Sequence, residues 1–150
     1  MPRNELISAS KKIHGILLES IEISDYCFGK PGFFGAMRNL FRKLDFVSSS
    51  VKLQGYVVNL DFCLNGIKSI QVYSVKEKNY IASLILFTEA LKNSIEKMDV
   101  VIQSLALKAD GGELPYNDYN YLFNQYDEAN VNRGLIGDEL NRNYQELMKG

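Results

Sequence analysis

The single histidine of the chain, His14, is its only side chain of the kind that commonly acts as a general base near neutral pH. A catalytic histidine needs a positioned partner, and no acidic residue occupies the helically spaced positions 10, 11, 17 or 18. His14 lies on the flank of an apolar stripe, together with Ile7, Leu17 and Ile21. We therefore expect a structural or neutral role for His14, and a protein that is not an enzyme and has no catalytic residues.

The chain also lacks the residue sets that hold metals or cofactors. One histidine excludes zinc and di-iron sites that need two, and two cysteines exclude a four-cysteine zinc site. The glycine-rich run 29–35 departs from the common phosphate-binding motifs, and residues 110–113 lack the alternating ligands of a calcium loop. Cys27 and Cys63 fall on or beside apolar stripes, which predicts reduced, inert thiols, with a disulfide between them as the alternative. We expect no metal and no cofactor.

Basic residues gather near the start of the second predicted helix. They are Arg38, Arg42, Lys43 and Lys52. Arg38 and Arg42 are four residues apart, so a helix places them on one face. Solvated basic faces are common in globular proteins, and the net charge of the whole chain is only −1. Binding of nucleic acid through this patch is therefore the alternative function.

Charge is distributed unevenly along the chain. Residues 1–108 hold 14 basic and 10 acidic side chains, whereas residues 109–150 hold three basic and eight acidic ones. The second region also contains five of the nine tyrosines, and tyrosines among polar residues are typical of protein interfaces. We therefore predict a protein-binding surface on the last helix and the loop before it. Its candidate residues are Tyr116, Asp118, Tyr121, Asp127, Glu128 and Arg133.

Arg133 is the clearest anomaly in the apolar pattern. It occupies a position on the apolar stripe of the last helix, between Ala129 and Ile136. A lone buried guanidinium is costly, so either it reaches solvent or an acid, or its stripe faces a partner subunit or ligand. Gly134 and Gly137 beside it permit close approach of another helix. The sequence therefore leaves open a homo-oligomer as well as a foreign partner.

Four segments with helical periodicity must position these residues. We expect helices over residues 4–28, 36–73, 76–108 and 117–148. Breaker residues separate them, notably Pro31 within the run 29–35 and the cluster 110–112 followed by Pro115. Four amphipathic segments joined by short breaks predict an all-α fold, an antiparallel four-helix bundle, with residues 1–150 as a single domain.

The second of these helices has an irregular pattern. Its early stripe runs from Met37 to Val51, and its later stripe, from Leu53 to Ile67, lies on a shifted face. The change falls near the serines at 48–50, whose hydroxyls can bond to the preceding turn and bend a helix. A long helix kinked near residues 48–50 is the first interpretation. Two shorter helices with a break near residue 49 are the alternative.

The other helices have more regular patterns. The first has an apolar seam from Leu6 to Cys27 with Ser20 as its polar member, and seven of eight seam positions from Ile81 to Leu105 are apolar. The cluster 110–112 is expected to end the third helix, and Asn117 to cap the fourth.

A partial resemblance supports the nucleic-acid alternative. The stretches Lys78–Leu84 and Gly134–Ile136 resemble small four-helix proteins of the ribosomal intervening-sequence type and retroelement accessory bundles. Those families are basic and bind RNA or RNA-bearing complexes, so the resemblance implies RNA binding. The acidic fourth segment departs from that pattern, and we therefore assign no family.

The pattern of apolar residues also bears on location. The first residues lack the apolar run of a signal peptide and no segment is long and apolar enough to span a bilayer, so we expect a cytoplasmic protein without membrane contact.

The sequence predicts a non-enzymatic helical bundle that binds a protein partner. Immunity proteins, antitoxins, chaperones and bacterial or phage accessory factors have this physical character.

Overall fold

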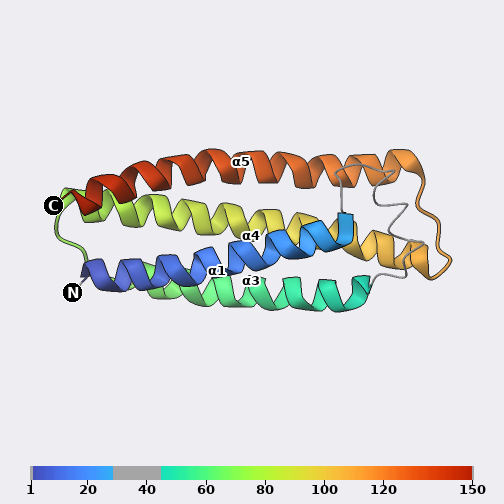
Figure 1. Cartoon of the computed structure of the whole chain (residues 1–150), viewed down its shortest axis with the longest axis horizontal. Helices are drawn as coiled ribbons and strands as arrows, with labels where there is room; N and C mark the ends of the chain where they lie inside the picture. The colour runs from blue at the N-terminus through green and yellow to red at the C-terminus, as the bar shows by residue number, and fades with distance from the viewer. Residues whose placement is uncertain (1, 29–44, 150) are drawn as a thin grey trace.

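The computed structural model describes residues 2–28 and 45–149, and these ranges contain four α-helices and no strand. The helices are α1 (Pro2–Phe28), α3 (Phe46–Lys68), α4 (Val75–Ala109) and α5 (Tyr116–Met148). They lie side by side in an elongated molecule, with both ends of the chain at the same end of it (Figure 1). The prediction of an all-α fold with four packed helices is confirmed for the described residues.

The central helix of the fold is α4. Its backbone lies close to those of α1, α3 and α5, and α1 also packs against α3. The backbone of α5, in contrast, approaches that of α4 and no other described helix. The predicted seam of α4 is buried, and so are further residues beside it, because a central helix is covered on more than one side. The largest fully buried side chains are Leu6, Ile13, Leu53, Leu60, Ile67, Tyr80, Leu84, Leu91, Ile95, Ile102, Leu105 and Tyr119.

The predicted bounds of the second helix, residues 36–73, are wrong. Asp45 is the N-cap of α3, and its carboxylate accepts a hydrogen bond from the Ser48 amide at 2.8 Å, so α3 begins at Phe46. The serines at 48–50 therefore lie in the first turns of α3 rather than at a mid-helix bend, and residues 36–44 lie outside the described residues. The helix ends at Lys68 instead of residue 73. The longest helix is α4, with 35 residues.

The ends of α4 are fixed by local hydrogen bonds. Ser74 and Glu77 form a capping box in which the Glu77 amide donates to the Ser74 hydroxyl at 3.1 Å and the Ser74 amide donates to the Glu77 carboxylate at 3.2 Å. These bonds hold the pKa of the Glu77 carboxyl below its usual value. At the other end Gly111 has a φ of +95°, and the Gly112 amide donates to the Leu107 carbonyl at 2.8 Å. The predicted stop at 110–112 is confirmed.

The start of α5 differs from the prediction. Pro115, not Asn117, occupies the N-cap position, and no side chain caps the helix there. The φ of Pro115 is −58°, close to the value that its ring imposes, and its carbonyl accepts a hydrogen bond from the Tyr119 amide at 3.0 Å. Asn117 lies within the first turn, as does Asp118.

The two cysteines form no disulfide with each other, although both lie within the described ranges. Cys27 is buried in the predicted seam of α1, and Cys63 is half-buried on α3. Burial raises the pKa of both thiols. A raised pKa disfavours the thiolate, which is the nucleophilic form of a cysteine.

Candidate binding groove between α1 and α5

The helices α1 and α5 contact each other at their two ends through side chains. At one end the Arg3 guanidinium donates a hydrogen bond to the Leu147 carbonyl. At the other end the Tyr126 hydroxyl donates to the Ser24 hydroxyl at 3.0 Å, and the rings of Phe28 and Tyr126 lie 5.8 Å apart. Because the two backbones stay apart between these contacts, the middle of the α1–α5 boundary is open.

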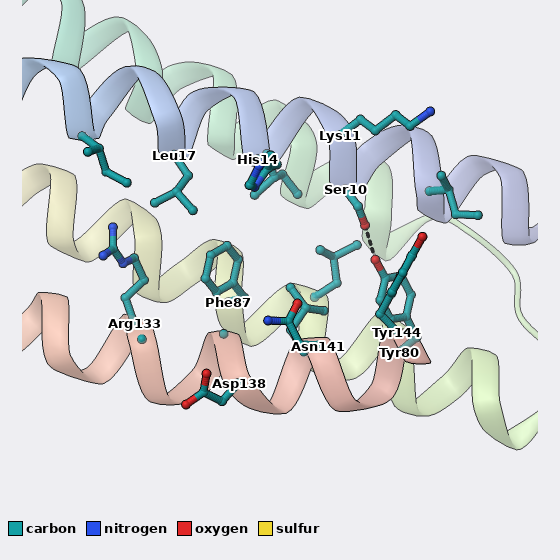
Figure 2. Close-up of a pocket in the computed structure, with 17 residues that line it drawn as sticks. Ser10, Lys11, His14, Leu17, Tyr80, Phe87, Arg133, Asp138, Asn141 and Tyr144 are labelled. Carbon is teal, nitrogen blue, oxygen red and sulfur yellow. Dashed lines mark hydrogen bonds between the residues drawn. The ribbon is translucent and has the colours of Figure 1, made fainter. Parts of the chain in front are cut away.

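A groove of about 640 Å³ occupies this opening. Its floor is formed by α4 through Tyr80, Leu84 and Phe87, and its walls are formed by α1 and α5 (Figure 2). The wall from α1 extends from Ile7 to Ile21. A volume of this size lies within the range of known ligand sites, which are often found between the helices of bundles.

Arg133 enters the groove from α5 and points toward α1 (Figure 2). Its side chain is half-buried, and burial lowers the pKa of its guanidinium. No described carboxylate lies within 4.0 Å of the Arg133 guanidinium. The ion pairs found within residues 2–28 and 45–149 all involve other basic side chains. Arginine stays protonated in proteins, so the groove contains a poorly solvated and uncompensated positive charge.

The charges around the groove do not neutralise Arg133. Lys11 and His14 lie on the opposite wall and are both exposed, and Asp138 is the single acidic residue of the lining. Asp138 is turned away from the Arg133 guanidinium (Figure 2). The groove is therefore apolar at its floor and biased toward positive charge at its walls, which suits an apolar ligand that carries an anionic group.

At the end of the groove near Tyr80, the side-chain hydroxyl groups of Ser10 and Tyr80 are already hydrogen-bonded within the protein. The Ser10 hydroxyl donates to the Leu6 carbonyl at 2.9 Å, so its lone pairs accept the hydroxyl hydrogen of Tyr80. Burial raises the pKa of the Tyr80 phenol, which keeps it protonated. The ring of Tyr144 lies 6.0 Å from that of Tyr80. These residues fix the shape of the groove and supply no nucleophile with an adjacent base.

Two glycines of α5 border the groove and differ in their surroundings. A Cβ atom at Gly137 would lie 3.3 Å from Cε2 of Phe87, so the absence of a side chain lets the Phe87 ring form the floor. A Cβ atom at Gly134 would meet nothing within 4 Å. Gly134 is therefore open space beside Arg133, whereas Gly137 is packed.

This difference predicts opposite outcomes for matched substitutions. We expect Gly134→Ala to raise the free energy of unfolding by about 0.5–1 kcal/mol, because alanine favours the helix and nothing obstructs its methyl group. Gly137→Ala gains the same helix propensity but must displace Phe87, so its net effect is smaller or destabilising. Urea unfolding of both variants measures the difference. Equal stabilisation by the two substitutions would contradict the packing of Phe87 on Gly137.

The predicted protein-binding residues lie on several faces of α5. Tyr121 and Glu128 are exposed and seven residues apart, so they share one face, whereas Tyr116 and Asp127 are exposed and eleven residues apart on another. Asp118 is exposed in the first turn. Arg133 alone of the predicted residues lines the groove.

Sequence reasoning missed the groove residues of α1 and most of those of α5. His14 and Leu17 were assigned to a flank of α1 without a neighbouring element, and Asp138 and Asn141 had no distinctive pattern.

Of the basic patch, Arg38, Arg42 and Lys43 lie outside the described residues, and Lys52 is exposed on α3. The structure therefore places only one member of that patch.

Within residues 2–28 and 45–149 no three His, Cys, Asp or Glu side chains are grouped as metal ligands. Of the four described helices, none has a stretch that is long and apolar enough to span a bilayer. No model of a known protein family, no curated protein and no solved structure matches the chain.

Proposed function

We propose that this chain is a non-enzymatic protein that binds a protein partner, and that the partner lays an amphipathic helix with a carboxylate group into the α1–α5 groove. The observation that carries the proposal is the uncompensated Arg133 guanidinium in an apolar groove. An acidic side chain of a partner would pair with that guanidinium, and such charge-assisted hydrogen bonds are stronger than neutral ones.

The shape of the groove supports a helix rather than a compact ligand. From Ile7 to Ile21 the wall of α1 extends for about 21 Å, which equals about four helical turns. Ile21 is itself exposed, and the neighbouring Leu18 is exposed as well, so apolar surface continues from the groove to its outer edge. A partner helix that places apolar residues every three or four positions matches a long apolar groove of this kind.

The exposed polar face of α5 provides the second part of the proposed interface. Tyr121 and Glu128 are exposed on α5 and precede Arg133 along the helix, and tyrosine offers contact area at low entropic cost. We propose the antiparallel four-helix bundle as the finer architecture, with the groove as the place where the bundle stays open. The proposal covers a cytoplasmic binding protein of the immunity, antitoxin, chaperone or accessory-factor type.

The test begins with capture of partners from the native host by the tagged full chain, identified by mass spectrometry. We expect Ile21→Glu to lower the affinity of the chain for the captured partner at least about tenfold, because a charge replaces an apolar contact in the groove. The matched control is Leu86→Glu, since Leu86 is similarly exposed on α4 but does not line the groove. Equal affinities of the two variants for the partner would exclude the groove as its site.

Tyr116→Ala combined with Tyr121→Ala tests the other part of the interface. If both tyrosines are changed and the affinity of every identified partner is unchanged, the exposed tyrosines of α5 have no part in binding.

Nucleic-acid binding remains the alternative proposal. It rests on the sequence patch Arg38, Arg42, Lys43 and Lys52, of which Lys52 is exposed on α3. It requires affinity for RNA or DNA that falls steeply as salt rises, because phosphate contacts release counterions. Filter binding at two salt concentrations distinguishes it from the protein-binding proposal.

A further inference from the structure

The outward face of α3 holds four apolar side chains that no described helix covers. Val47, Val51, Val58 and Phe62 are 62%, 63%, 53% and 71% exposed. They recur at helical spacing and therefore form one continuous stripe. We call these four residues the α3 stripe. Single exposed apolar residues are ordinary, but a continuous stripe along a helix marks an interaction surface.

The surroundings of the α3 stripe resemble the centre of an interface. Only three residues of α3 are charged, namely Lys52, Asp61 and Lys68. Asp61 pairs with Lys92 of α4 at 2.7 Å, and Lys68 lies 3.9 Å from Glu89 of α4, so both are directed to the flank of the stripe. Depletion of charge at the centre with charged residues at the rim is typical of protein interfaces.

The spacing of the α3 stripe is the same in both directions along the helix. Val47 and Val51 are four residues apart, seven residues separate Val51 from Val58, and Val58 and Phe62 are again four apart. The middle of the stripe falls between Gln54 and Gly55. A Cβ atom at Gly55 would meet nothing within 4 Å. Because Gly55 has no side chain, another helix can approach the backbone closely at the middle of the stripe.

We propose that two copies of the chain form a dimer through the α3 stripe, with the two α3 helices antiparallel. A two-fold axis near Gln54 and Gly55 then places Val47 opposite Phe62 of the partner subunit, and Val51 opposite Val58 of the partner subunit. Two-fold dimers use the same patch on both chains, so the patch must be complementary to itself. The symmetric spacing of the stripe meets this requirement, and a surface for an unrelated partner has no need of it.

The length of the α3 stripe suits the apolar centre of a dimer interface. The stripe extends over about 22 Å of helix, and the pairs Asp61–Lys92 and Lys68–Glu89 provide a polar rim beside it. A stable interface buries on the order of 800 Å² on each partner, of which the apolar centre is only part. Four large apolar side chains from each copy supply that centre.

The proposed dimer goes beyond the partner-binding function and does not depend on it. In Figure 1, α3 lies at one edge of the molecule and α5 at the opposite edge. A dimer through α3 therefore leaves the α1–α5 groove open, and the failure of either proposal leaves the other standing.

The first test is the molar mass of the full chain in solution. Light scattering or sedimentation over a range of concentrations should approach twice the 17.0 kDa of the single chain. Val58→Glu should return the mass to that of one chain at every concentration. The matched control is Val131→Glu on α5, because Val131 is 58% exposed and lies outside the stripe, and it should leave the dimer unchanged. A wild-type chain that stays monomeric, or a Val58→Glu variant that still dimerises, overturns the proposal.

The second test determines the register of the two helices. In a Cys63→Ser background, where the remaining Cys27 is buried, Gln54→Cys lies near the proposed two-fold axis and should form a disulfide-linked dimer on mild oxidation. Val47→Cys lies about 11 Å from that axis along the helix and should not link to its own copy. Efficient linkage through Val47→Cys indicates parallel helices and overturns the antiparallel arrangement. Circular dichroism confirms that each variant is folded.

Discussion

Leu91→Ala should lower the free energy of unfolding by about 2–5 kcal/mol, the largest effect that we expect from a single substitution. Leu91 is 0% exposed and lies on α4, the helix that packs against all three others, so little of the surrounding structure can collapse into the cavity. For a chain of this length, the loss corresponds to a decrease in melting temperature of roughly 5–15 °C. Thermal and urea unfolding of the variant measure it.

Leu86→Ala is the matched control for this prediction. Leu86 lies on the same helix but is 55% exposed, so its truncation should change the free energy of unfolding by less than about 0.5 kcal/mol. Helix propensity is the same in both substitutions and cancels in the comparison. Similar losses for Leu86→Ala and Leu91→Ala would mean that the centre of the core does not lie along α4.

Arg133→Met should have opposite effects on stability and on binding. Methionine has a similar length and no charge, so the free protein no longer holds a poorly solvated guanidinium and should gain up to about 1 kcal/mol of stability. A partner that pairs a carboxylate with Arg133 would leave that carboxylate buried without its counterion. We expect its affinity to fall about 30-fold or more, equivalent to about 2 kcal/mol. Chemical unfolding and titration calorimetry with the captured partner measure the two effects.

Arg142→Met is the control for Arg133→Met. Arg142 is exposed and pairs with Glu139 one turn away on the same helix, and exposed ion pairs contribute little. We expect its stability and affinity to stay close to those of the wild type. If Arg133→Met instead destabilises the free protein, Arg133 has a favourable partner and the proposed role of its charge is wrong.

The regular helices were predictable because their signals are local. The seam from Ile81 to Leu105 is buried almost as expected, since it repeats at helical spacing through about seven turns of α4 without a breaker. The stop at 110–112 was also visible, because Gly111 adopts a backbone conformation that few other residues tolerate.

The errors in helix boundaries have physical causes as well. The end of α3 at Lys68 was missed because residues 69–74 contain neither glycine nor proline, and Ile70 and Val72 pack against the core from a loop. The start of α5 was misplaced because Pro115 takes the cap position without any side-chain hydrogen bond. The end of α3 therefore has no residue that usually marks such a boundary, whereas the residue that marks the start of α5 is a proline instead of a hydrogen-bonding cap.

The groove itself could not be predicted, because it depends on the distance between two helices that are far apart in the sequence. Helical periodicity indicates which face of α1 or α5 is apolar, but not that the two backbones stay apart between their end contacts. Arg133 gave the one usable signal, a charge where the pattern required an apolar residue. The α3 stripe could not be predicted for a related reason. Val47 and Val51 continue the early apolar pattern of the second predicted helix, but the structure leaves both exposed, and Val58 and Phe62 belong to neither predicted stripe.

The uneven burial of α5 has a consequence for the dynamics of the molecule. Its backbone packs extensively along α4, but Leu147 is its only buried residue beyond Ala129. Segments with few buried side chains open at a lower free energy than the whole domain, so the second half of α5 should open more readily than its first half and than α4. Backbone amides of α5 between residues 130 and 146 should therefore exchange hydrogen with solvent sooner than those of α4. A partner bound in the groove would slow that exchange, because the second half of α5 forms one wall of the groove.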